Sequence, residues 1–178
     1  MKQHVKTEND SLKAIMGGVE EIKKAAQQGA FPNGTIPEGE KNSIGTVTKA
    51  LCSDKALVRA YLEGRRADTR RFDTGEMPGK MLVTGIFLAF SDDKELIKLA
   101  CVGNTLSEDN EAAFVRLFAD DSDTLEKYLK ECPEGPTFLD TTFDVAEELG
   151  VADLLYKLED KYASNQEVSA PTFADLLK

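Results

Sequence analysis

The sequence predicts an all-α protein built from five helical hairpins that pack on one another in chain order. Two observations support this prediction. First, apolar residues within 141–161 recur at the spacing of a helix turn on both sides of Gly150. Second, the same arrangement of two short amphipathic segments around a turn recurs along almost the whole chain. Each segment is only about two to three turns long, so it must bury its apolar face against a neighbour to be stable.

The last hairpin shows the pattern most clearly. Its apolar residues fall on one face of each helix: Val145, Ala146 and Leu149 in the first, and Leu154, Leu155 and Leu158 in the second. Gly150 stands between the two helices, and glycine adopts the positive φ of a tight turn at little steric cost. We therefore expect a helix, a glycine turn and a second helix over residues 141–161.

This hairpin resembles an ankyrin repeat. Thr141, Phe143, Val145 and Ala146 match the opening of the family pattern, Gly150 matches its turn, and Asp153, Leu154 and Leu155 match the start of its second helix. The hairpin departs from the pattern at Thr142, where proline is usual, and at Asp144, where histidine is usual. The resemblance implies an ankyrin-like helical-hairpin solenoid, which binds other proteins through its concave face and the loops between repeats.

The first copy of the hairpin spans residues 11–32. Ala14 and Gly18 are four residues apart, as Ala146 and Gly150 are in the last copy. This shared spacing predicts a helix on each side of Gly18.

The second and third copies span residues 44–64 and 84–103. The turn of the second is built on Ser53-Asp54 in place of glycine, and both of these residue types are good N-caps. In the third copy, the run Met81–Phe90 is apolar enough to form a buried strand, but its place in the repeat predicts a helix.

The fourth copy, residues 112–132, lacks the threonine-led opening of the family pattern, and Pro133 ends its second helix. The second helices of the first three copies are expected to close at Gly29, Gly64 and Gly103. These glycines are 35 and 39 residues apart, which corresponds to the ankyrin period with short insertions.

These copies divide the chain into a flexible N-terminus, a repeat domain and a C-terminal linker that ends in a short helix. The expected boundaries are 1–8 for the N-terminus, 9–162 for the repeat domain, with repeats over 9–43, 44–80, 81–109, 110–139 and 140–162, and 163–178 for the C-terminal segment.

The composition argues against a membrane protein, a secreted protein and a metalloprotein. No apolar run approaches the roughly 20 residues of a membrane span, and the N-terminus has no apolar signal segment. Cys52, Cys101 and Cys132 lack the spacing of metal ligands, so we expect free thiols in the cytoplasm. His4, the single histidine, stands in the terminal segment, where acid–base catalysis is disfavoured.

Two loops resemble ligand-binding motifs only faintly. Gly75–Lys80 has too few residues between its glycines for a phosphate loop and lacks the Ser or Thr after the lysine. Asp120–Asp123 resembles a calcium loop with Glu131 at its twelfth position, but Leu125 occupies the sixth, which requires glycine. We interpret the first as a loop and the second as a helix cap, and we expect no catalytic residue, cofactor or metal.

Charge is distributed unevenly and suggests a binding site. Residues 1–80 carry 14 basic and 11 acidic side chains, whereas residues 81–178 carry 8 and 21. A basic cluster, with one aromatic residue beside it, is predicted to bind the partner: Arg65, Arg66, Arg70, Arg71 and Phe72. The guanidinium group suits carboxylate or phosphate recognition, and a partner protein with an acidic patch is one that this cluster would fit. The alternative is that these arginines are merely solvated or pair with the acidic repeats.

The sequence thus predicts a monomeric, cytoplasmic protein-interaction module that binds a partner protein and neither nucleic acid nor membrane. The acidic C-terminal half would repel the phosphates of a nucleic acid. Three alternatives remain open: a bacterial or viral effector acting in the host cytosol, an enzyme inhibitor that blocks a site, and a helical enzyme with an unrecognised carboxylate site.

Overall fold

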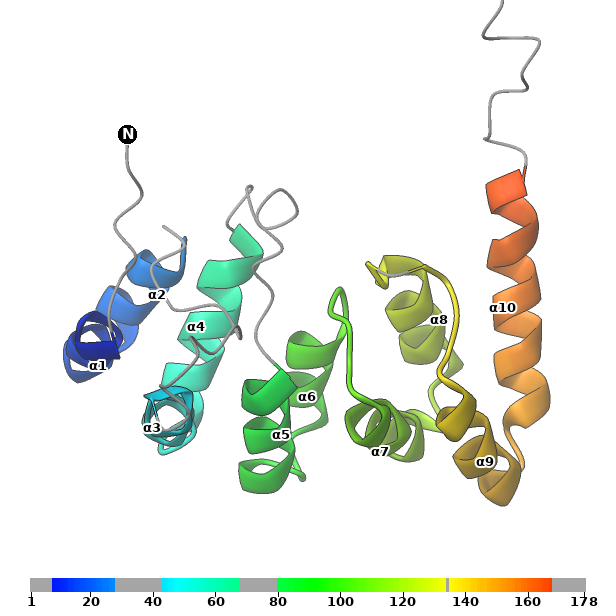
Figure 1. Ribbon diagram of the computed structural model, residues 1–178, viewed down its shortest axis with the longest axis horizontal. Helices are drawn as coiled ribbons and strands as arrows, with labels where there is room; N and C mark the ends of the chain where they lie inside the picture. Colours follow the sequence, from blue (N-terminus) through cyan, green and yellow to red (C-terminus); the bar gives the residue numbers. More distant parts are fainter. Residues whose placement is uncertain (1–7, 28–42, 68–79, 134, 168–178) are drawn as a thin grey trace, which may run out of the picture. The chain divides into compact units, whose positions relative to one another are not determined.

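The computed structural model describes residues 8–27, 43–67, 80–133 and 135–167. All the regular secondary structure of these residues is helical, which confirms the all-α prediction (Figure 1). The helices are α1 (Glu8–Met16), α2 (Val19–Gln27), α3 (Ser43–Leu51), α4 (Lys55–Ala67), α5 (Lys80–Ala89), α6 (Lys94–Cys101), α7 (Glu108–Phe118), α8 (Ser122–Glu131), α9 (Asp140–Leu149) and α10 (Ala152–Glu167). The chain divides into two compact units, unit 1 (Met1–Leu106) and unit 2 (Ser107–Lys178).

Consecutive helices pair into hairpins in both units. Unit 1 contains the pairs α1–α2, α3–α4 and α5–α6, and unit 2 contains α7–α8 and α9–α10. In unit 1 the first helices of the hairpins, α1, α3 and α5, lie side by side, and so do the second helices α2, α4 and α6 (Figure 1). In unit 2, α7 packs beside α9 and α8 packs beside α10. Each unit is therefore a two-layer stack, and we call α1, α3 and α5 the first-helix layer of unit 1.

The turns inside the hairpins follow the predicted chemistry. Gly18 and Gly150 have φ values of 84° and 71°, in the left-handed region that favours glycine. At the turn between α3 and α4, the Asp54 carboxylate accepts a hydrogen bond of 2.7 Å from the backbone N–H of Ala56. Asp93 caps α6 in the same manner, accepting from the N–H of Leu96 at 3.0 Å. Two kinds of turn thus connect the helices of a hairpin. In one, glycine ends the first helix; in the other, aspartate caps the start of the second.

Each unit has an apolar core between its two helix layers. The side chains of Ile22, Val58, Ile86, Leu96 and Ile97 are buried in unit 1. In unit 2, the rings of Phe114 and Phe118 lie 4.7 Å apart and those of Phe114 and Tyr128 lie 5.0 Å apart, centroid to centroid. Burial of these side chains stabilises helices that are too short to persist alone.

Leu96→Ala is expected to lower the free energy of unfolding by roughly 2–5 kcal/mol, because the side chain leaves a cavity in the core. Leu96 is fully buried on α6, whereas Leu88 on α5 is 83% exposed. The matched variant Leu88→Ala removes the same atoms from the surface and is expected to change stability by less than about 0.5 kcal/mol. Urea denaturation followed by circular dichroism measures both. Equal losses would contradict the packing of α6.

Two sequence expectations need correction, and several others lie outside the described residues. Gly64 does not close the second helix of its hairpin, because α4 continues to Ala67. Residues 163–167 of the predicted linker are helical, since α10 ends at Glu167. The remaining features lie outside the described part of the chain: His4, Gly29, Gly75–Gly79, Arg70, Arg71, Phe72 and the terminal turn 172–178.

Candidate functional site

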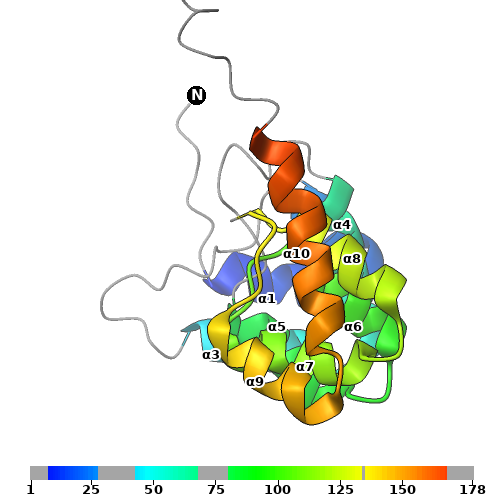
Figure 2. The ribbon, with the colours of Figure 1, turned by 90° about the vertical axis from the view of Figure 1, so that its right-hand side faces the viewer.

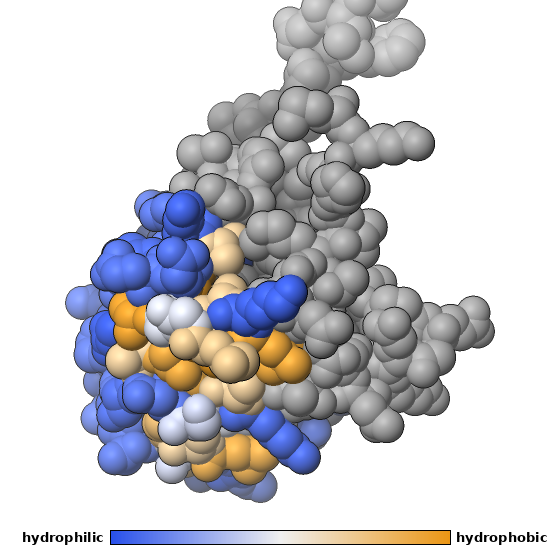
Figure 3. All heavy atoms as spheres, turned by 90° about the vertical axis from the view of Figure 1, so that its left-hand side faces the viewer, coloured by the Kyte–Doolittle hydropathy of each residue, from blue (hydrophilic) through white to orange (hydrophobic). Residues whose placement is uncertain are grey.

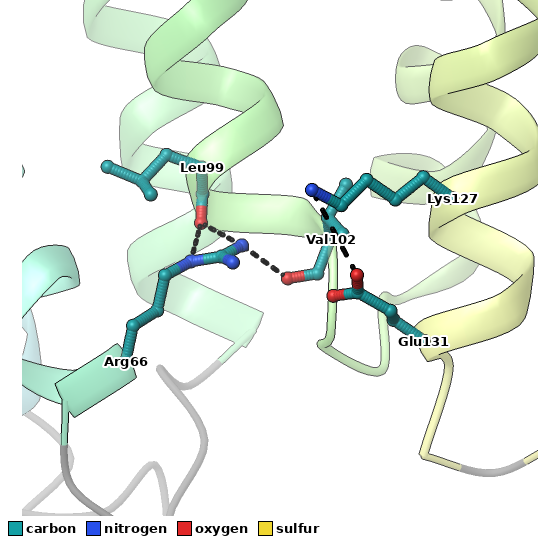
Figure 4. A network of polar contacts seen from close by, with 5 residues as sticks. All are labelled: Arg66, Leu99, Val102, Lys127 and Glu131. Atoms are coloured by element: carbon teal, nitrogen blue, oxygen red, sulfur yellow. Dashed lines mark hydrogen bonds and ion pairs between the residues drawn. The ribbon is translucent and has the colours of Figure 1, made fainter.

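Two members of the predicted arginine site lie in the last turn of α4 and take part in the packing of unit 1. Arg65 is only 4% exposed. Arg66 donates hydrogen bonds to the carbonyl oxygen of Leu99, at 3.3 Å from Nε and 3.0 Å from Nη2, and to that of Val102, at 2.7 Å from Nη2 (Figure 4). These carbonyls belong to the C-terminal end of α6, where no further helix turn can satisfy them. Both arginines therefore have an intramolecular role.

Arg70, Arg71 and Phe72 lie outside the described residues. The structure therefore places only two of the five residues of the predicted binding cluster, Arg65 and Arg66. The role of the other three in binding stays a prediction. A signal in the sequence could have distinguished Arg65 from the rest. It follows Val58 by seven residues and Leu62 by three, so it continues the apolar face of α4, and both of these side chains are buried.

The acidic run at Asp120–Asp123 forms a helix cap, as the sequence predicts. The Asp121 carboxylate accepts hydrogen bonds from the backbone N–H of Thr124 at 3.0 Å and from its hydroxyl at 2.6 Å. Glu131 would be the twelfth residue of a calcium loop. Its Oε1 instead lies 4.0 Å from Nζ of Lys127, also on α8 (Figure 4). Within the described ranges, no group of three or more His, Cys, Asp or Glu side chains is placed to hold a metal ion.

The most enclosed carboxylate of unit 2 belongs to Glu111 on α7, which is 2% exposed. Its Oε1 accepts a hydrogen bond of 2.6 Å from the Tyr128 hydroxyl. Its Oε2 accepts from the backbone N–H of Leu139 at 2.7 Å and from the Thr142 hydroxyl at 2.5 Å. Glu111 thus connects α7 to α8 and to the start of α9, and its contacts are those of a structural cap. Sequence reasoning missed this residue, because Glu111 lies in a helix rich in other acidic residues.

The cysteine thiols have the properties of interior side chains. Burial raises the pKa of Cys52 to about 11 and also raises the pKa of Cys101. Cys52, Cys101 and Cys132 form no disulfide bond. Since the thiolate is the reactive form, Cys52 and Cys101 are poor nucleophiles at neutral pH.

Exposed apolar side chains mark a different surface of unit 1. Met16 on α1 and Leu88 on α5 are 87% and 83% exposed, more than any other large apolar side chain in the described residues. Both belong to the first-helix layer. Figure 3 views the molecule from the side of the α1–α2 hairpin, and apolar side chains there lie directly between hydrophilic ones. Val19, at the start of α2, is 40% exposed. Within the first-helix layer, Met16 and Leu88 lie on helices that flank α3, and each offers one exposed apolar side chain to a partner.

No helix among the described residues is both long enough and apolar enough to cross a membrane. Comparison of the chain with models of protein families, with curated proteins and with solved structures found no match.

Proposed function

We propose that this chain is a protein-interaction module, an ankyrin-like array of helical hairpins that binds a partner protein through the first-helix layer of unit 1. The observation that carries the proposal is the exposure of Met16 and Leu88, both on helices of that layer. In ankyrin proteins the first helices and the loops between repeats contact the partner. Arg70, Arg71 and Phe72 precede α5 in the sequence, and we propose that they contribute to partner binding as well.

A large exposed apolar side chain favours binding when a partner buries it. Burying a leucine removes apolar surface from water and is favourable by about 1.5–3 kcal/mol. Thr84, one helix turn before Leu88, is also exposed and shares its face of α5. None of residues 84–88 is charged, so this stripe carries no charged group between Thr84 and Leu88. A partner can therefore cover Leu88 without desolvating a charge on this stripe.

Site-specific photo-crosslinking tests this proposal. A photo-reactive amino acid placed at position 88 is expected to crosslink a discrete partner in an extract of the cells in which the protein occurs. The control position is Glu95, which is exposed on α6 in the other helix layer. Leu88→Asp should reduce partner capture about tenfold or more, by analogy with the loss of a central interface residue. Crosslinking from position 95 together with undiminished capture by Leu88→Asp would contradict the proposal.

A further inference from the structure

The last hairpin carries a stacked aromatic pair, one ring of which is exposed. The rings of Phe143 on α9 and Tyr156 on α10 stack with their centroids 4.4 Å apart and their planes 19° apart. Tyr156 remains 50% exposed. On its inner side, Phe143 makes an edge-on contact with the buried ring of Phe138, centroid to centroid 6.3 Å. The pair is thus held in place from beneath while one of its rings is open to solvent.

Carboxylates flank this pair on both helices. Residues at the i, i+3, i+4 and i+7 positions of a helix share one face. On α9 these are Asp140, Phe143, Asp144 and Glu147, and on α10 they are Asp153, Tyr156, Lys157 and Asp160. In Figure 2, α10 lies on the side of unit 2 that faces the viewer and runs upward, with α9 beside its lower end. Because the two rings stack, the two stripes lie next to one another and form what we call the aromatic-acidic face.

The charge of this face is strongly one-sided. Its two stripes hold five carboxylates and one ammonium group, that of Lys157, and every one of these charged residues is exposed. Two other carboxylates of this hairpin have partners outside the face. Glu148 pairs with Arg116 at 2.7 Å, and Glu159 accepts hydrogen bonds from the Thr137 hydroxyl and the Phe138 N–H. The exposed ring therefore lies in a region of negative potential.

We propose that the aromatic-acidic face binds an arginine-bearing basic segment of a partner protein. A guanidinium group can stack on the exposed ring and pair with a carboxylate at the same time, because it is both planar and cationic. An acidic or polyanionic ligand would be repelled, and a purely apolar ligand would leave the flanking carboxylates desolvated. This surface belongs to unit 2, so the inference does not depend on the binding role proposed for the first-helix layer of unit 1.

Fluorescence anisotropy with labelled peptides and the full chain tests the inference. Octa-arginine is expected to bind more tightly than octalysine, and octaglutamate is expected not to bind. Asp144→Asn with Asp153→Asn should weaken octa-arginine binding about tenfold, since each removes a charge beside the ring pair. The matched control is Asp109→Asn with Asp123→Asn, which removes two exposed carboxylates from α7 and α8 of the same unit and should weaken binding less than about twofold.

A second variant separates stacking from charge. Tyr156→Leu keeps an apolar side chain but removes the ring, so it should abolish the preference for octa-arginine over octalysine while leaving the charge of the face unchanged. Equal weakening by the two double variants would overturn the inference, because binding would then reflect the general acidity of unit 2. Self-association of the full chain that excludes the peptide would also overturn it, since the occupant would then be a second copy of the protein.

Discussion

Glu111→Ala is expected to lower the free energy of unfolding by about 3 kcal/mol or more, because it leaves three donors without their acceptor and each unsatisfied buried donor costs roughly 1–3 kcal/mol. The donors are the Tyr128 hydroxyl, the Leu139 N–H and the Thr142 hydroxyl. Leu139 is the N-cap residue of α9 and has no side-chain hydrogen bond of its own to cap the helix. The carboxylate of Glu111 therefore accepts, from α7, the N–H of the N-cap residue, which is the contact that a glutamate at N3 makes in a capping box.

Urea denaturation of the full chain measures this loss, with two variants as controls. Glu108→Ala removes an exposed carboxylate from the same helix and is expected to change stability by less than about 0.5 kcal/mol. Glu111→Gln keeps one acceptor oxygen and is expected to fall between the other two variants. If Glu111→Ala were as stable as Glu108→Ala, the buried network would contribute nothing to the fold of unit 2.

Gly64→Ala is expected to destabilise unit 1 by about 2 kcal/mol or more, as overpacked positions do. Helix propensity alone predicts the opposite sign, since alanine is favoured over glycine by about 1 kcal/mol within a helix. However, a Cβ atom at Gly64 would lie 2.5 Å from the carbonyl oxygen of Lys23 and 2.8 Å from the Cβ of Ala26. Because the first contact is with backbone of α2, the two helices would have to separate.

Gly85→Ala on α5 is the matched control. A Cβ atom there would lie 2.8 Å from Cγ2 of Thr48 and 3.2 Å from Sγ of Cys52, both of which are side-chain atoms. Side chains adjust more readily than backbone, so Gly85→Ala should cost less than Gly64→Ala. Thermal unfolding of the two variants in parallel gives the comparison. A gain in stability for Gly64→Ala would show that α2 and α4 do not approach as closely as described.

The helical hairpins were predictable because their signals are local. Gly150 and Asp54 act on residues that are close in sequence, and the turn positions at both are confirmed. The buried stripe of Leu125, Tyr128 and Leu129 is likewise set by helix periodicity. Such features depend on the spacing of residues within one hairpin.

The roles of Gly64, Arg66 and Glu111 were not predictable in this way, because each depends on a residue in another hairpin. Gly64 resembles a helix stop in the sequence, yet its small size is needed for the approach of α2. Arg66 belongs to a basic run that resembles a solvated or binding loop, but its partners are 33 and 36 residues further along the chain. The candidate binding surfaces were not predictable for the same reason, since packing between hairpins decides which side chains are exposed.

The hydrogen bonds from Arg66 to the last carbonyls of α6 have a consequence for how the hairpins of unit 1 can be combined. In a regular repeat array, stability is a sum of terms for each repeat and for each interface, so units can be deleted or exchanged. Here the end of one helix is completed by a side chain of the preceding hairpin. A fragment that begins at α5 would lose this cap and expose the helix end to water. The order of these two hairpins is therefore specified by chemistry as well as by chain connectivity.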